Sequence, residues 1–112
     1  MPKAAPPSRK VANRIELCGR LANPPSLRVT PAGTAVLSLV VDCGDQAGVL
    51  RIPIVMAGES ARELAPRLST GLTVRASGAL RATPVRTRAG RGSAGLGVEV
   101  IADAITLADG QA

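Results

Sequence analysis

Apolar and polar residues alternate along four stretches of this chain, and each stretch predicts a half-buried β-strand. In the first, which begins at Asn13, every second residue from Ile15 to Leu21 is apolar or glycine. The other three cover residues 34–43, 49–57 and 72–81. A fifth strand is expected over 97–108, with a bulge near 102–104 because the alternation changes phase there.

The segments between these strands carry turn and helix signals. The sequence ANPPS (22–26) should end the first strand, because proline lacks an amide hydrogen and restricts φ, and a short extended piece then runs to a turn at residues 30–33. In the stretch 49–57, Leu50 is expected to point inward with the isoleucines, and Pro53 should lie at a sheet edge or bulge. Residues 59–71 predict one short helix, which Pro66 should shorten or kink and Gly71 should close.

Three strands, a short helix and two further strands are the element order of the OB-fold, an all-β, five-stranded Greek-key barrel with its helix between strands 3 and 4. We therefore predict a flexible basic arm over residues 1–12, an OB-fold domain over 13–108, for which the family resemblance given below implies binding of single-stranded DNA, and a short tail over 109–112. In this fold the face of strands 2 and 3, together with the loop between strands 4 and 5, commonly binds oligonucleotides.

The composition restricts both the core and the partner. The 112 residues include no Phe, Tyr or Trp, so the core must be built from aliphatic side chains. Fourteen Lys and Arg against eight Asp and Glu give a net charge of +6, which favours a polyanionic partner. Twelve of the fourteen basic residues are Arg, whose planar fork suits phosphate.

Several classes of function are disfavoured by what the chain lacks. It contains no histidine to activate a serine or cysteine, so no enzymatic activity and no catalytic residue is predicted. Cys18 and Cys43 have no CxxC spacing, and we expect two reduced thiols, no metal site and no cofactor. The sequence has no apolar run of membrane-spanning length and no signal-peptide core in MPKAAPPSRK, so a cytoplasmic protein without a membrane partner is expected.

The loop RATPVRTRAGRG (81–92) is the strongest candidate for nucleic-acid contact. It carries no carboxylate and lies at the position where OB-folds bind oligonucleotides. Its four arginines are Arg81, Arg86, Arg88 and Arg91. The alternative is a solvated hairpin whose charges only prevent edge pairing. Arg28 and Arg51 are further candidates, although Arg28 could instead pair with Asp42 and Arg51 could be an exposed residue without a ligand.

Four segments, NRIELCGRL, RVTPAGTAV, IPIVMAG and LTVRASGAL, resemble the primosomal replication protein N (PriB) family, which is related to the bacterial single-stranded DNA-binding protein family. The resemblance covers residues 13–107. It implies a homodimer that associates through its first strands, binds single-stranded DNA and helps a restart helicase and primosome loading proteins reassemble the replication machinery, at a nucleoid-associated cytoplasmic location. The chain ends at ITLADGQA without the acidic tail typical of general single-stranded DNA-binding proteins, which favours the restart factor.

The resemblance also assigns residues to the interface. Arg86, Arg88 and Arg91 fall where family members place basic residues that contact DNA, whereas Arg51 and Ala57 fall where the related proteins carry stacking aromatics. Because stacking contributes about 1–3 kcal/mol per base, binding here should be driven mainly by phosphate contacts. Three or four neutralised phosphates would give a slope of log K against log salt of about −2 to −3.

Three alternative functions remain open from the sequence. The chain could be a general single-stranded DNA-binding protein. It could be an OB-fold adaptor that contacts other replication proteins and binds little DNA. It could also be an RNA-binding module, because a basic surface with few base contacts hardly distinguishes the two backbones.

Overall fold

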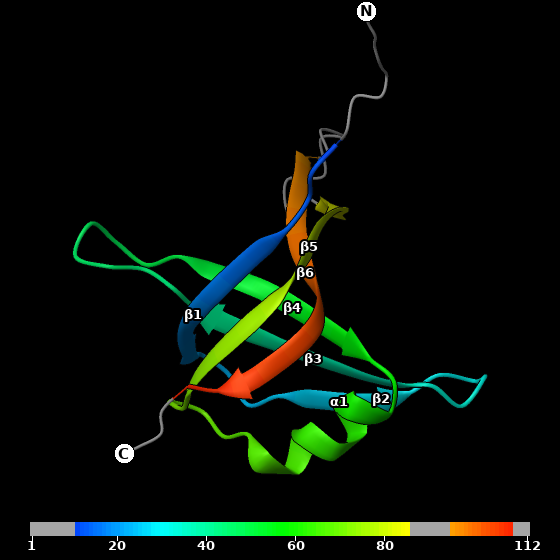
Figure 1. The fold of residues 1–112 in the computed structure, drawn as a ribbon. Coiled ribbons are helices and arrows are strands. Elements are labelled where there is room, and N and C mark those ends of the chain that lie inside the picture. Colours follow the sequence, from blue (N-terminus) through cyan, green and yellow to red (C-terminus); the bar gives the residue numbers. More distant parts are fainter. Residues whose placement is uncertain (1–10, 86–94, 109–112) are drawn as a thin grey trace, which may run out of the picture.

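The computed structural model describes residues 11–85 and 95–108 (Figure 1). Most of the predicted arm, the predicted tail and the loop residues Arg86, Arg88 and Arg91 lie outside the described residues. The fold and the candidate site are therefore built from the remaining chain.

Six strands form one sheet that closes on itself. They are β1 (Ile15–Leu21), β2 (Ser26–Val29), β3 (Ala35–Asp42), β4 (Arg51–Ala57), β5 (Thr73–Val85) and β6 (Gly95–Leu107). Their order is β1-β5-β6-β4-β3-β2, and β1 also pairs with β3 through Arg20 opposite Asp42 and Leu21 opposite Val41. This last pairing closes five strands into a barrel and leaves β2 at the outer edge of β3, which confirms the predicted OB-fold.

The core follows the predicted alternation most closely in β3. Ala35, Leu37, Leu39 and Val41 are all buried there, while the residues between them are half-buried. Buried aliphatic side chains from the other strands and the helix complete one cluster, including Leu21, Ile54, Met56, Leu64, Leu68, Val74, Val100 and Ile105. A core without rings is possible here because the small barrel is filled by branched aliphatic side chains from every closing strand.

The helix is shorter than its apolar pattern. α1 spans Glu59–Leu64 and continues as a 3₁₀ turn over Ala65–Arg67, because Pro66 has no amide hydrogen for an α-helical bond. The segment lies at one end of the barrel (Figure 1), where Ala61 and Leu64 face the core. The prediction that Gly71 closes the helix was wrong: with φ of 93° it lies in the turn before β5.

Within the described residues, no helix is long and apolar enough to cross a membrane.

The hairpin between β3 and β4 corrects a second expectation. β4 begins at Arg51, and Leu50, expected to point inward, is 51% exposed. The amide of Cys43 donates to the carbonyl of Leu50 at 2.8 Å, so residues 43–50 pair with each other and extend away from the barrel (Figure 1). The alternation of the sequence therefore continues beyond the point where the core ends.

Pro53 lies within β4, opposite Val40 of β3. On the other side of β4, the parallel pairing with β6 joins Ile54 to Val100 and Val55 to Ile101. Pro53 thus precedes the part of β4 that is paired on both sides, which explains how a residue without an amide hydrogen is accommodated in this strand.

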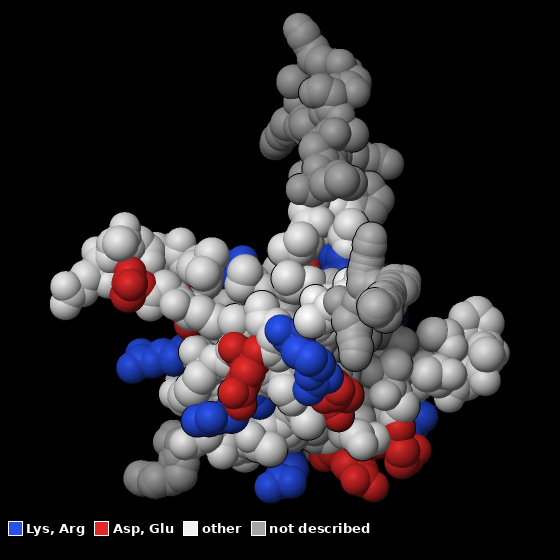
Figure 2. All heavy atoms as spheres, turned by 45° about the horizontal axis from the view of Figure 1, so that its top comes forward, with Lys and Arg blue, Asp and Glu red and all other residues white. Residues whose placement is uncertain are grey.

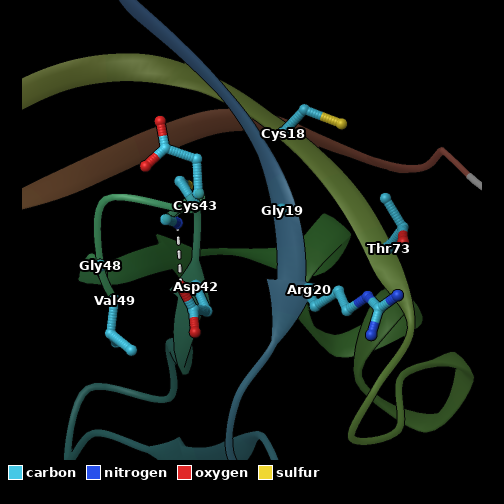
Figure 3. A pocket seen from close by; sticks show the side chains of 10 residues that line it. Cys18, Gly19, Arg20, Asp42, Cys43, Gly48, Val49 and Thr73 are labelled. Atoms are coloured by element: carbon cyan, nitrogen blue, oxygen red, sulfur yellow. Dashed lines mark hydrogen bonds between the residues drawn. The ribbon is translucent and has the colours of Figure 1, made fainter.

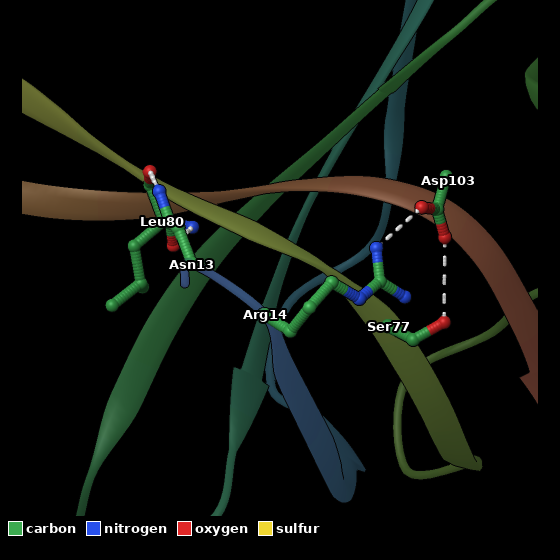
Figure 4. Close-up of polar contacts among 5 residues, drawn as sticks. All are labelled: Asn13, Arg14, Ser77, Leu80 and Asp103. Atoms are coloured by element: carbon green, nitrogen blue, oxygen red, sulfur yellow. Dashed lines mark hydrogen bonds and ion pairs between the residues drawn. The ribbon is translucent and has the colours of Figure 1, made fainter. Parts of the chain in front are cut away.

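The predicted bulge is present in β6. Ser77 pairs with Ala104 and Gly78 with Ala102, so Asp103 has no partner in the ladder. Its carboxylate accepts hydrogen bonds from Arg14 Nη1 at 2.8 Å and from Ser77 Oγ at 3.4 Å (Figure 4). These bonds hold the charged side chain of the bulge on the outside of the barrel.

Asn13 extends the pairing between β1 and β5 by one step. Its side-chain amide donates to the carbonyl of Leu80 at 2.9 Å and its side-chain oxygen accepts from the amide of Leu80 at 2.9 Å (Figure 4). Beyond Leu80, β5 continues to Val85 and pairs with β6 as far as Gly95, further than the predicted strands reached. The two strands therefore form a ribbon that includes residues 81–85 of the predicted loop.

Candidate nucleic-acid interface

The outward face of β3, β4 and β6 lies where the OB-fold pattern predicts a binding surface. Because alternate residues of β3 point into the core, Val36, Ser38 and Val40 are left on its outer side. Strand register then places Ser38 opposite Val55, and Val55 beside Ile101. The result is a row of mostly apolar side chains across three strands.

Two adjoining pockets, of about 450 Å³ and about 280 Å³, hollow this face. Both are lined by Ser38, Val55 and Glu99, so we treat them together as the outer groove. Its floor is aliphatic, with further contributions from Val36, Val40, Pro53, Ala57 and Ile101. Such a floor can contact the flat face of a base, although it provides no ring for stacking.

Two of the predicted arginines line the outer groove, and their charges differ in availability. Arg28 lies on β2 opposite Val36 and is exposed, and no carboxylate of the described residues forms an ion pair with it. Arg81 lies on β5 opposite Glu99 and donates to Glu99 Oε2 from Nε at 3.1 Å and from Nη2 at 2.6 Å. The charge of Arg81 is therefore balanced within the protein, whereas that of Arg28 is available to a ligand.

Arg51 is not brought to the outer groove. It begins β4, opposite Asp42, and lines neither of the two pockets. The alternative pairing of Arg28 with Asp42 is also absent from the described residues. Instead the Asp42 carboxylate accepts the amide of Gly44 at 2.9 Å, and this bond, assisted by the amide of Leu50 and the charge of Arg51, holds the pKa of Asp42 below its ordinary value. Asp42 thus fixes the base of the 43–50 hairpin.

A larger pocket of about 620 Å³ lies at that hairpin base, lined by Cys18, Arg20, Asp42 and Cys43 among others (Figure 3). Figure 3 shows Cys18 and Arg20 projecting to one side of β1 and Cys43 lying on the other. Both cysteines are free thiols. Burial raises the pKa of Cys43, and the charges of Asp42 and Cys18 raise it further, so its thiolate is disfavoured. Cys43 is therefore not an activated nucleophile, and the described residues contain no group of three His, Cys, Asp or Glu that could hold a metal ion.

The face formed by β1, β5 and β6 differs in its charge arrangement. Arg14 pairs with Asp103 at 2.8 Å and Arg75 with Glu16 at 3.5 Å, with all four side chains more than half exposed. Figure 2 shows basic and acidic side chains interspersed over one face of the molecule. Exposed pairs of this kind contribute little to stability, because water and salt screen the attraction. They leave little unbalanced positive charge on β1 and its neighbours to attract a polyanion.

Glu99 is the residue of the outer groove that the sequence analysis missed. It occupies the strand GVEV, where a single acidic residue among apolar ones gives no sign of its partner. Only the register of β5 and β6, which sets Arg81 opposite Glu99, reveals the pair. The sequence itself carries no signal for this pair, because the predicted loop over 81–92 includes Arg81 and ends before Glu99.

The comparison with protein-family models agrees with this architecture. The model of the single-strand binding protein family matches residues 12–108, which is nearly the whole chain. No curated protein matches the chain. Proteins of this family bind single-stranded DNA and are not enzymes. The chain belongs to the single-strand binding protein family.

Proposed function

We propose that this protein binds single-stranded DNA along the outer groove and acts as an accessory protein of replication restart. The observation that carries the DNA-binding part is the groove itself, an aliphatic surface on β3, β4 and β6. At its β2 side lies Arg28, which forms no ion pair with any described residue. The β5–β6 ribbon leads from this groove toward Arg86, Arg88 and Arg91, for which DNA contact is likewise a proposal. Phosphates would be held by these arginines and by Arg51, which lies at the start of β4 and outside the groove.

The direct test is a titration of a dye-labelled 30-nucleotide single strand with the wild-type protein and with the triple variant R86A/R88A/R91A. Fluorescence anisotropy suits the measurement because the chain has no Trp or Tyr whose emission could report binding. We expect the triple variant to bind more weakly and with a flatter salt dependence, since each lost phosphate contact reduces the slope by about 0.7. Unchanged affinity would remove the loop from the mechanism.

We also propose that the protein forms a homodimer through its first strands. Residues 15–19 of β1 pair with β5 alone among the described strands, so their other edge is open to a second copy. The nearby carboxylate of Glu16 already has a partner in Arg75 and would not be left without one. Light scattering with and without a single strand gives the mass directly, and a monomer under both conditions would contradict this part of the proposal.

The role in restart rests on the four segments that resemble the primosomal replication protein N family and on the missing aromatic platforms, which suit an accessory protein better than one that coats long strands. It predicts binding to a restart helicase and to primosome loading proteins at a nucleoid-associated, cytoplasmic location. Pull-down of a purified restart helicase, with and without DNA, tests the partner.

The same experiments separate the alternatives. Helicase binding without binding of the 30-nucleotide strand at low salt would select the adaptor, and strand binding without helicase binding would select a general single-stranded DNA-binding protein. Competition between DNA and RNA strands of one sequence distinguishes the RNA-binding module.

A further inference from the structure

One oxygen of the Glu99 carboxylate accepts hydrogen bonds from Arg81, and the other accepts none from the described residues. Both donors from Arg81 go to Oε2, and Oε1 accepts no hydrogen bond from the described residues. The side chain is only 17% exposed, and it lines both pockets of the outer groove. A partly desolvated acceptor therefore lies where the two pockets meet.

This acceptor differs in chemistry from the other polar groups of the groove. The side chains of Asn23, Ser26 and Ser38 each both donate and accept hydrogen bonds. An ionised carboxylate only accepts, and Glu99 is the one carboxylate among the described residues that line the groove. A group that approaches Oε1 must therefore bring an N–H or O–H donor.

The phosphates of a single strand do not meet that requirement, because they carry negative charge and no donor. They are directed instead to Arg28, which lines the groove from β2, whereas Glu99 lines it from β6. A strand that lies with its phosphates at Arg28 turns its bases toward Glu99. Single strands expose the Watson–Crick edges of their bases for this kind of contact.

We infer that Glu99 reads base edges, favouring bases that present an amino group over thymine. This inference rests on the proposed binding of single-stranded DNA in the outer groove. The amino groups of cytosine, adenine and guanine donate toward Oε1, whereas thymine offers one ring N–H between two carbonyl oxygens that repel a carboxylate. Arg81 is the positioning residue, since its two hydrogen bonds fix the carboxylate in place.

The test compares labelled 20-nucleotide oligodeoxycytidylate and oligodeoxythymidylate at pH 7.5 and one salt concentration. Wild-type protein is expected to bind the cytosine strand about tenfold more tightly, as for one hydrogen bond to a charged group. A strand of N4,N4-dimethylcytosine, which lacks the donor, should lose that advantage with the wild-type protein and so needs no variant that could misfold.

The second comparison of the experiment uses the variant Glu99→Gln. Its amide both donates and accepts, so the ratio of the two affinities should fall close to one, while release of Arg81 changes both affinities together. Glu63→Gln is the matched control, because it removes the same charge from an exposed position of α1 outside the groove. It should keep the wild-type ratio.

The outcomes separate the two proposals. If neither strand binds, the proposed function fails and this inference fails with it. If both strands bind equally, if dimethylation has no effect, or if Glu99→Gln keeps the preference, the inference is overturned while DNA binding stands. An equal loss of preference in Glu63→Gln would also overturn it, since the effect would then belong to net charge and not to the groove.

Discussion

Replacing Arg28 by alanine tests whether the outer groove contacts phosphates. Arg28 is exposed on β2, lines the groove and has no ion pair among the described residues, so its charge is available to DNA. Each phosphate contact on a single strand contributes about 0.7 to the slope of log K against log salt. If the wild type neutralises three or four phosphates, its slope is about −2.1 to −2.8, and that of Arg28→Ala should be about −1.4 to −2.1.

The same slope contribution determines how the affinities of the wild type and of Arg28→Ala differ as the salt concentration changes. Between 50 and 200 mM salt, a slope difference of about 0.7 changes the ratio of wild-type to variant affinity by about 2.6-fold, with the larger loss at low salt. Anisotropy of a labelled strand over a series of salt concentrations measures both slopes. The variant should fold normally, because the side chain it removes is exposed and makes no ion pair within the described chain.

Arg67→Ala is the matched control for this experiment. Arg67 is also exposed, lies in the 3₁₀ turn after α1, and lines neither pocket of the groove. The two variants have the same net charge, so a general electrostatic effect would change both slopes equally. The reasoning is refuted if Arg28→Ala keeps the wild-type slope, or if Arg67→Ala flattens it by the same amount.

Three further predictions concern the barrel and its thiols. Gly78→Ala should lower the free energy of unfolding by about 3 kcal/mol, because a Cβ at this position meets the backbone of Ile101. Urea unfolding followed by circular dichroism measures this change. Wild-type stability of the variant would contradict the close approach of the two backbones. The pKa of Asp103 is lowered, chiefly by the hydrogen bond from Arg14, so the ionised carboxylate stabilises the folded state. This stabilisation is present above the ordinary carboxyl pKa of about 3.9 and is lost as the pH falls through the lowered pKa. Asp103→Asn should therefore be less stable than the wild type at pH 7, and its free energy of unfolding should change less as the pH is lowered. An unchanged pH dependence of unfolding would argue against the hydrogen bond between Arg14 and Asp103. Iodoacetamide should modify the exposed Cys18 before Cys43, whose pKa is raised, as peptide mass spectrometry would show; the reverse order would contradict the assigned environments.

Sequence patterns predicted the elements whose faces differ most in environment. In β3 one face is buried against the core and the other is not, so alternation gave both the strand and its inward residues. The bulge was predictable for the same reason, since an extra residue at Asp103 reverses the phase of the pattern. The order of these elements was then sufficient to predict the barrel.

The parts that sequence could not supply depend on contacts between distant strands. Leu50 follows the same alternation as its neighbours, yet it is exposed because the hairpin leaves the barrel before β4 begins. The available charge of Arg28 and the balanced charge of Arg81 look identical in the sequence. Only strand register shows that one arginine faces a carboxylate and the other does not.

The missing aromatic residues make the arrangement of charge in the groove more important for selectivity. Stacking is tolerant of sequence because every base has a flat face, and phosphate contacts carry no sequence information. A groove with an aliphatic floor and the available cation Arg28 would therefore bind all strands alike. Against such a background even one fixed acceptor dominates the part of the binding energy that depends on the base. Glu99, held by Arg81, is the group in the described groove with the chemistry to provide that difference.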